Sequence, residues 1–283
     1  MRILIIGSNG MLGSDLVAEW TDDEVIPATS READIRDIEQ VRRLVAQEHP
    51  DWIVLTAAYT DVEGSERNPA LAFAVNGEGT KNVARVAREL DTKLFYVSTD
   101  YVFDGTSHRP YEPNDPIHAL NVYGASKAAG EKAVQAHAKH WLIARTSWLF
   151  GASRVSFPEK VLRTAESQLE LKVVADQVGC PTYTRDLATA IRDLVQADAH
   201  GILNVTNSGW CSWFEFAKEV LQRAGRNTPV LPITTAEATR LAKRPAYSVL
   251  SPTSLAAHGI RMRSWQKAVE AYLGDLRENS KLD

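Results

Sequence analysis

Short apolar runs alternate with amphipathic segments along the first half of the chain. These runs comprise residues 2–6, 24–29, 52–56, 94–97 and 141–145. Runs of this length predict strands buried in a parallel sheet. Between them apolar positions recur at helical spacing, as at Ile38, Val41 and Leu44, and residues 69–90 are expected to form one long helix. Strands that alternate with helices predict a doubly wound, Rossmann-like parallel α/β sheet.

The second half has fewer apolar runs. Its expected elements include strands at 171–174 and 202–205 and helices at 159–167 and 184–196. A further helical stripe that includes Trp213, Phe216 and Leu221 is expected to lie in the core. We therefore expect residues 151–283 to form mainly a smaller, partly discontinuous substrate-binding lobe, from which some segments return to the main sheet.

Evenly spaced glycines follow the first apolar run. The segment GSNGMLG, residues 7–13, joins a predicted strand to a predicted helix. Gly7 permits a tight turn, Gly10 lets the backbone approach a pyrophosphate, and Gly13 allows the helix to pack closely on the strand. The helix N-terminus supplies N–H groups for phosphates. The spacing is G-x-x-G-x-x-G rather than G-x-G-x-x-G, and the alternative is an ordinary strand–helix turn.

We predict that residues 1–150 form a dinucleotide-binding domain. The predicted cofactor contacts in the turn are Gly7, Asn9, Gly10, Met11 and Gly13.

The end of the second apolar run bears on the choice between NADPH and NADH. An acidic residue at this point favours NAD because it binds the ribose 2′-hydroxyl. The chain instead has Ser30 and Arg31, which suit a 2′-phosphate, so the prediction is NADPH. Glu32 follows directly and keeps NADH as the alternative. Asp34 and Ile35 are predicted to flank the adenine, unless they form only a turn and a helix cap.

Small and polar residues follow the next two predicted strands. Ala57 and Ala58 let a cofactor lie against the backbone, and Tyr59 stands beside them. Thr99 follows the fourth apolar run. Because ligands bind outside the carboxyl ends of strands in such sheets, its hydroxyl is placed to hydrogen-bond a substrate carbonyl. The alternative is a threonine that merely closes a strand.

Tyr123 and Lys127 are four residues apart at the start of a run of good helix formers. Residues at this spacing share one helix face, so the phenol and the ammonium are expected to project into the same cleft. At 4 Å and an effective dielectric near 20, the cation favours the phenolate by ~4 kcal/mol, or roughly three pKa units before desolvation opposes it. The pair then predicts a general acid for a carbonyl that becomes an alkoxide. The alternative is a surface helix with an extended lysine.

Composition narrows the class of protein. The chain has 283 residues, of which 44% are hydrophobic and 24% charged, with a net charge of −4. Acids and bases are interspersed, so no basic face for nucleic acid is expected. Cys180 and Cys211 form no metal or disulfide pattern, and no segment has the pattern of a signal peptide or a membrane span. We expect a soluble, cytoplasmic protein.

Six motifs together resemble a known family. They are residues 7–13, AAYTD at 57–61, STDYVFDG at 98–105, NVYGASK at 121–127, RTSWLFG at 145–151 and DQVGCPT at 176–182. In this order they resemble dTDP-4-dehydrorhamnose reductases, which are extended short-chain dehydrogenases/reductases. The segment RPAYSVL at 244–250 also resembles the C-terminal signature of that family. The likeness covers nearly the whole chain.

The resemblance implies roles for matching residues. Tyr123 would protonate the C4 oxygen of the sugar, Lys127 would lower the pKa of the tyrosine and bind the nicotinamide ribose, and Thr99 would hydrogen-bond the substrate carbonyl. The remaining substrate contacts that it implies are Asp100, Tyr101, Trp148, Thr182 and Arg185. Among these, the resemblance gives Arg185 the substrate diphosphate. The chain departs from the family pattern at Ala119, Cys180 and Tyr247, which leaves the exact sugar open.

The resemblance also implies an activity. It is NADPH-dependent reduction of dTDP-4-dehydro-6-deoxy-L-mannose to dTDP-L-rhamnose. The alternatives are a nucleotide-sugar epimerase or dehydratase on the same scaffold and a non-catalytic NADP-binding regulatory subunit. Neither nucleic acid nor a membrane is an expected partner. Monomer and homodimer both stay open. Mg²⁺ between subunits is known from some relatives, but the acidic residues near the termini have no diagnostic metal spacing.

Overall fold

The computed structural model describes residues 1–278. Its main layer is a parallel sheet with the strand order β10-β5-β4-β3-β1-β2. The strands are β1 (Arg2–Ile6), β2 (Glu24–Ala28), β3 (Trp52–Leu55), β4 (Lys93–Thr99), β5 (Trp141–Thr146) and β10 (Gly201–Asn204). This confirms the predicted doubly wound α/β class. Among the described residues no helix is both long enough and apolar enough to span a membrane.

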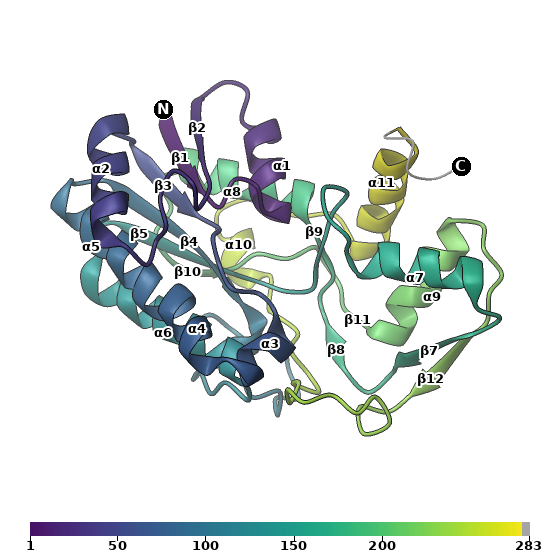
Figure 1. The fold of residues 1–283 in the computed structure, drawn as a ribbon. Helices are drawn as coiled ribbons and strands as arrows, with labels where there is room; N and C mark the ends of the chain where they lie inside the picture. The colour runs from purple at the N-terminus through teal and green to yellow at the C-terminus, as the bar shows by residue number, and fades with distance from the viewer. Residues whose placement is uncertain (279–283) are drawn as a thin grey trace.

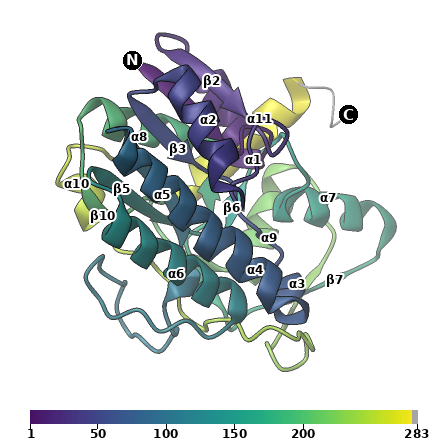
Figure 2. The ribbon, with the colours of Figure 1, turned by 60° about the vertical axis from the view of Figure 1, so that its left-hand side comes forward.

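Helices cover both faces of the sheet. Side chains alternate between the faces of a strand, so Ile3 and Ile5 pack into one core while Leu4 and Ile6 pack into the other. The first core lies against α1 (Met11–Glu19), α8 (Thr184–Gln196) and α10 (Thr253–Ala256). The second core lies against α2 (Ile38–Glu48), α5 (Thr80–Glu89) and α6 (Val122–His137), which run across the near face of the sheet in Figure 2.

A second lobe stands beside the sheet, on the right in Figure 1. Its helices are α7 (Phe157–Ser167), α9 (Trp213–Arg223) and α11 (Trp265–Glu278). They share an aromatic core that includes Phe150, Phe216 and Tyr272. Three two-stranded pairings complete this side: β6 (Leu149–Phe150) with β9 (Thr182–Tyr183), β7 (Leu171–Val174) with β12 (Val230–Ile233), and β8 (Val178–Gly179) with β11 (Cys211–Ser212). Although α8 and β10 come after residue 151, both belong to the main sheet and its covering layer.

The helix expected over residues 69–90 has a different form. After α3 (Val62–Arg67), the chain forms α4 (Pro69–Phe73), a π-helical turn (Ala74–Gly79) and then α5. In this turn the side chain of Asn76 accepts a hydrogen bond from the backbone N–H of Tyr59 at 2.8 Å and donates to the Ser126 hydroxyl at 2.9 Å. The wider turn thus ties the loop after β3 to α6. The prediction of one uninterrupted α-helix is wrong at this point.

Candidate active site

A cleft of about 870 Å³ follows the carboxyl edge of the sheet and extends to the second lobe. Its walls come from the glycine loop, the ends of β3, β4 and β5, the first turns of α6, and parts of the second lobe. Many predicted site residues lie on these walls: Gly7, Asn9, Gly10, Met11, Gly13, Ser30, Asp34, Ile35, Ala57, Ala58, Thr99, Asp100, Tyr101, Tyr123, Lys127 and Trp148. The fold therefore gathers residues from distant motifs into one cleft.

The glycine loop leaves backbone exposed to the cleft. Gly7 has φ +97°, and a Cβ there would lie 2.5 Å from the amide nitrogen of Ala57. A side chain at Gly13 would collide with the carbonyl of Gly7. Helix α1 begins after Gly10 with no side-chain cap and no acid in its first turn. Its first N–H groups are therefore open to an anionic ligand, as the diphosphate of a dinucleotide requires.

The end of the cleft that follows β2 has a different arrangement of charges from the one the sequence indicates. The carboxylate of Glu32 accepts from both the hydroxyl and the N–H of Thr29, at 2.6 and 2.7 Å, and the hydroxyl bond lowers the pKa of Glu32. Arg36, which the sequence analysis did not single out, lines the cleft but binds Asp34 through Nε at 3.0 Å. Arg31 is exposed beside Ser30 and is not part of the cleft wall.

Tyr123 and Lys127 occupy the first turns of α6, whose start is fixed by two contacts. The side chain of Asn121 accepts from the N–H of Gly124 at 2.7 Å, and the Glu66 carboxylate accepts from the N–H of Val122 at 2.8 Å. A Cβ at Gly124 would collide with the carbonyl of Tyr101, so glycine allows α6 to approach the end of β4 closely. The phenol and the ammonium consequently line the same cleft as Thr99.

The electrostatics of this pair differ from the expectation. Burial raises the pKa of the Tyr123 phenol above its usual value, although an interaction with Thr99 opposes the shift. Burial also lowers the pKa of Lys127 to about 7. The Lys127 Nζ donates to the backbone carbonyl of Val97 at 2.7 Å. The expectation that Lys127 pulls the pKa of Tyr123 down is therefore wrong for this structure, because desolvation dominates.

Asp100 is buried behind Thr99. Its carboxylate accepts from the Thr99 hydroxyl at 3.0 Å and from the Ser248 hydroxyl at 2.5 Å. Burial raises the pKa of Asp100 to about 7, against the effect of these hydrogen bonds. Asp100 thus fixes the orientation of the Thr99 hydroxyl. Ser248 belongs to the C-terminal segment 244–250, whose contact with Asp100 could not be inferred from spacing.

An aromatic pair forms part of the wall from the second lobe. The rings of Trp148 and Trp213 are stacked, with centroids 3.6 Å apart and planes 8° apart. Trp148 has a left-handed backbone with φ 48°, which is uncommon for a bulky side chain. Gly179 leaves room for it, since a Cβ there would lie 2.5 Å from the indole Cε2. Trp213, which the sequence analysis assigned to the core, packs against the aromatic core and also lines the cleft from the first position of α9.

Three other predicted residues lie outside the cleft wall. The N–H of Tyr59 is bonded to Asn76. Thr182 is fully buried and its hydroxyl donates to the carbonyl of Cys180 at 3.2 Å. Arg185 pairs with Asp275 at 2.8 Å, which draws its guanidinium towards α11. Neither Thr182 nor Arg185 lines this cleft, and their contacts with the substrate stay predictions.

Three basic residues that the sequence analysis did not assign to the site lie on the cleft wall. Lys160, Arg154 and Arg244 all line the cleft. Arg154 donates through Nε to the carbonyl of Asn9 at 3.0 Å, so it connects the second lobe to the glycine loop. Arg244 opens the segment 244–250, and its membership of that motif was the signal that could have identified it.

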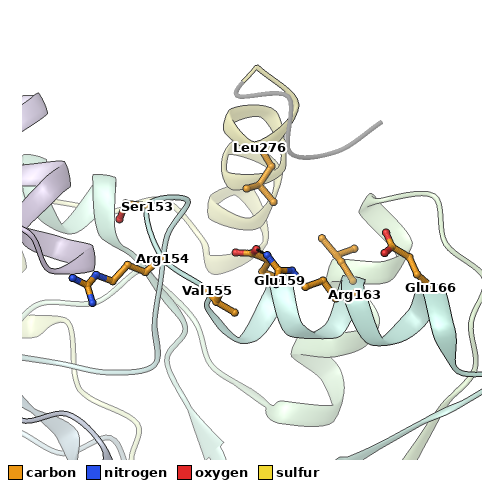
Figure 3. A pocket seen from close by; sticks show the side chains of 8 residues that line it. Ser153, Arg154, Val155, Glu159, Arg163, Glu166 and Leu276 are labelled. Atoms are coloured by element: carbon orange, nitrogen blue, oxygen red, sulfur yellow. Dashed lines mark hydrogen bonds and ion pairs between the residues drawn. The ribbon is translucent and has the colours of Figure 1, made fainter.

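A smaller pocket of about 500 Å³ lies between α7 and α11 (Figure 3). Arg163 and Glu159 pair with one another across one turn of α7. Arg154 points away from this pocket in Figure 3, and Leu276 points towards it from α11. Within residues 1–278, no group of three His, Cys, Asp or Glu side chains is arranged to hold a metal ion.

Comparison with known proteins identifies the family. The model of the RmlD substrate binding domain matches residues 1–278. The chain belongs to this family. It is 39% identical to the spore coat polysaccharide biosynthesis protein SpsK of Bacillus subtilis, over 96% of both chains. It is 37% identical to a dTDP-4-dehydrorhamnose reductase of Burkholderia thailandensis, over 98% of this chain and 99% of the relative.

A solved structure of the RmlD family resembles the whole fold. It is the dTDP-4-dehydrorhamnose reductase of Bacillus anthracis in complex with NADP. The TM-score is 0.95 at 38% identity, with 97% of this chain and 99% of that chain covered. The resemblance found in the sequence motifs is therefore confirmed at the level of family and fold.

Proposed function

We propose that this RmlD-family protein reduces the C4 keto group of dTDP-4-dehydro-6-deoxy-L-mannose and forms dTDP-L-rhamnose, with NADPH as the reductant. The observation that carries the proposal is the meeting of Thr99, Tyr123 and Lys127 on one wall of the cleft that begins at the glycine loop. The names of the relatives and the NADP in the Bacillus anthracis structure support the same activity.

A bound NADPH supplies the hydride that reduces C4. Tyr123 keeps its proton at neutral pH because burial raises the pKa of its phenol. As negative charge develops on the C4 oxygen, the phenol donates its proton to that oxygen. The Thr99 hydroxyl donates its one proton to Asp100 in the structure, so it would have to turn away from Asp100 to hydrogen-bond the same oxygen. Lys127 lies one helical turn further on and would hold the nicotinamide ribose.

The rest of the cleft accommodates the cofactor and the nucleotide-sugar substrate. In this proposal residues 1–150 hold the cofactor: the glycine loop and the start of α1 bind its diphosphate, and Ala57 and Ala58 lie against it. Ser30 and Arg31 meet the 2′-phosphate, and Asp34 and Ile35 flank the adenine. Residues 151–278 contribute much of the substrate face. Trp148, stacked on Trp213, forms an apolar wall for the sugar, and Tyr101 lines the same cleft.

The test is to offer dTDP-4-keto-L-rhamnose to the full chain with NADPH or NADH and to follow the loss of reduced-cofactor absorbance. Tyr123→Phe should lower kcat by roughly 10²–10⁴-fold, while the Kd for NADP changes by no more than about twofold. Full turnover in that variant would contradict the assignment of the proton donor. Purified protein that carries stoichiometric cofactor and consumes no NADPH would instead favour an epimerase or dehydratase.

A further inference from the structure

Two side chains of the second lobe are hydrogen-bonded to the glycine loop. Arg154 donates to the backbone carbonyl of Asn9 through Nε at 3.0 Å and through Nη2 at 2.5 Å. The neighbouring Ser153 hydroxyl donates to the carbonyl of Met11 at 3.2 Å. In Figure 3 the Arg154 side chain points away from the rest of the second lobe, towards the purple ribbon of the N-terminal segment. The second lobe thus places a guanidinium group directly beside the glycine loop.

The positive charge of Arg154 has no counter-charge in the structure. Within residues 1–278 its guanidinium forms no ion pair, and its two hydrogen bonds share one uncharged carbonyl oxygen. Nη1 carries two further N–H donors, and neither is bonded to any of these residues. The side chain is exposed and lines the cleft. An anion can therefore bind this guanidinium without displacing a carboxylate.

The start of α1 adds a second positive feature at the same place. The helix begins after Gly10, and its first turn has no acidic residue. The free N–H groups at a helix N-terminus act as a partial positive charge. Asn9, whose carbonyl holds Arg154, directly precedes Gly10 in the chain. An anion bound to the first N–H groups of α1 therefore lies next to the guanidinium of Arg154.

The other cations of the cleft are held elsewhere. Arg36 is paired with Asp34 near the end of β2, and Lys127 is bonded to the carbonyl of Val97. Among the cationic side chains of residues 1–278 that line this cleft, Arg154 alone is hydrogen-bonded to the glycine loop. We propose that Arg154 binds the diphosphate of the nicotinamide dinucleotide from the side of the second lobe.

This contact makes the cofactor a bridge between the two lobes. The start of α1 holds the diphosphate from the main sheet, and Arg154 holds it from the second lobe. The bonds to Asn9 fix the guanidinium before the cofactor arrives, so binding costs less side-chain entropy. NADP and NAD share the diphosphate, so Arg154 contributes affinity for both, unlike Arg31, whose proposed partner is the 2′-phosphate. This inference rests on the proposed function, because it takes the cleft to hold a nicotinamide dinucleotide.

The test measures binding of NADP⁺ and of NAD⁺ to the full-length chain by isothermal titration calorimetry. Arg154→Gln should raise the Kd of both dinucleotides by a similar factor, roughly five- to tenfold, because one charged contact is lost. Arg154→Lys should recover part of the loss, since an ammonium keeps the charge but lacks the planar fork. Arg163→Gln is the matched control, because Arg163 is an exposed arginine of the second lobe that lines the other pocket and pairs with Glu159. It should leave both affinities within about twofold of the wild type.

The dependence on salt separates a charge contact from a purely structural one. Salt screens the attraction between an exposed guanidinium and a diphosphate. Between about 0.05 and about 0.5 M ionic strength, the Kd for NADP⁺ should therefore rise more in the wild type than in Arg154→Gln. Without cofactor, the unfolding temperatures of the two proteins should match.

Several outcomes would overturn the inference. They are wild-type NADP⁺ affinity in Arg154→Gln, an equal loss in Arg163→Gln, and the same salt dependence in Arg154→Gln as in the wild type. A loss confined to NADP⁺ would assign Arg154 to the 2′-phosphate instead. A wild type that binds neither dinucleotide would overturn both this inference and the proposed function. If both dinucleotides bind through Arg154 but no NADPH is consumed with dTDP-4-keto-L-rhamnose, the proposed reaction fails while this contact stands.

Discussion

The Nζ of Lys127 lies 2.7 Å from the carbonyl oxygen of Val97 and 4.1 Å from the centroid of the Tyr96 ring. These contacts fasten α6 to β4 just before Thr99, the residue at which the strand ends. An ammonium has three donors, and Val97 takes one of them. Lys127 can therefore position the tyrosine helix against the strand and still offer donors to a ligand in the cleft.

Lys127 should make the stability of the protein depend on pH in the alkaline range. Its pKa is about 7 in the folded protein and 10.5 when unperturbed. Between these values the unfolded chain binds more protons, so the free energy of unfolding rises with pH, by at most ~1.4 kcal/mol per pH unit. Lys127→Met should lack this rise. Denaturant unfolding of the wild type and of Lys127→Met at pH 7.5 and at pH 9.5, each roughly inside this window, measures the rise in the free energy of unfolding. Equal pH dependence in the two proteins would contradict the depressed pKa.

Asp100 should have the opposite effect at acid pH. Its pKa is raised from 3.8 to about 7 on folding, so between these values the folded protein binds more protons than the unfolded chain. The free energy of unfolding should therefore fall as pH rises through this window. Asp100→Asn should abolish the fall. Ser248→Ala should move it to higher pH, because the carboxylate loses a hydrogen bond that favours its charged form. An unchanged profile in Asp100→Asn would show that Asp100 does not titrate in this range.

Local sequence signals account for many of the predicted residues that line the cleft. The effects of the glycines of residues 7–13 are confined to backbone close by. Tyr123 and Lys127 lie one helical turn apart, so their spacing alone places them on one face of the helix. The strands themselves and the burial of residues such as Ile3 and Leu4 follow from short apolar runs for the same reason, whereas the strand order is set by tertiary pairing.

Long-range contacts account for what was missed. Ser248 meets Asp100 across 148 residues, and Arg244 meets Tyr101 across 143 residues. Neither contact has a spacing that a sequence pattern could reveal. Arg185 has a suitable charge for a phosphate, but its partner Asp275 is 90 residues away. Desolvation of Tyr123 likewise depends on tertiary packing, and it reverses the pKa shift that pairwise charge reasoning predicts.

Arg31 should decide the preference for NADPH. Its exposed guanidinium has no ion pair among the described residues, whereas that of Arg36 is held by Asp34. An unpaired guanidinium beside Ser30 is available to a 2′-phosphate. Arg31→Ala should lower kcat/KM for NADPH by roughly tenfold, a loss typical of one charged hydrogen bond, and leave the value for NADH nearly unchanged. Arg36→Ala is the comparison, and it should change the NADPH-to-NADH ratio less. A larger change in Arg36→Ala would assign the 2′-phosphate to Arg36 instead.

Glu131 and Arg145 form a buried ion pair beneath the site, with side chains 0% and 2% exposed. The Arg145 Nη2 lies 2.7 Å from Glu131 Oε2, and the Ser98 hydroxyl donates to Glu131 Oε1 at 2.6 Å. Glu131→Gln leaves a buried guanidinium without its counter-charge, so we expect a loss of about 3–5 kcal/mol in the free energy of unfolding.

Two comparisons separate this effect from a general cost of losing a charge. Asp91→Asn breaks the exposed pair with Lys139 and should cost less than about 1 kcal/mol. Replacing both Glu131 and Arg145 with methionine should cost less than Glu131→Gln alone, because no unpaired charge then remains in the interior. Urea unfolding of the four proteins at neutral pH measures these differences. If Glu131→Gln were no more destabilising than Asp91→Asn, the buried pair would not hold α6 against β5. The rigidity of the wall that carries Tyr123 and Thr99 would then have to come from the Lys127–Val97 contact and the Asn121 cap.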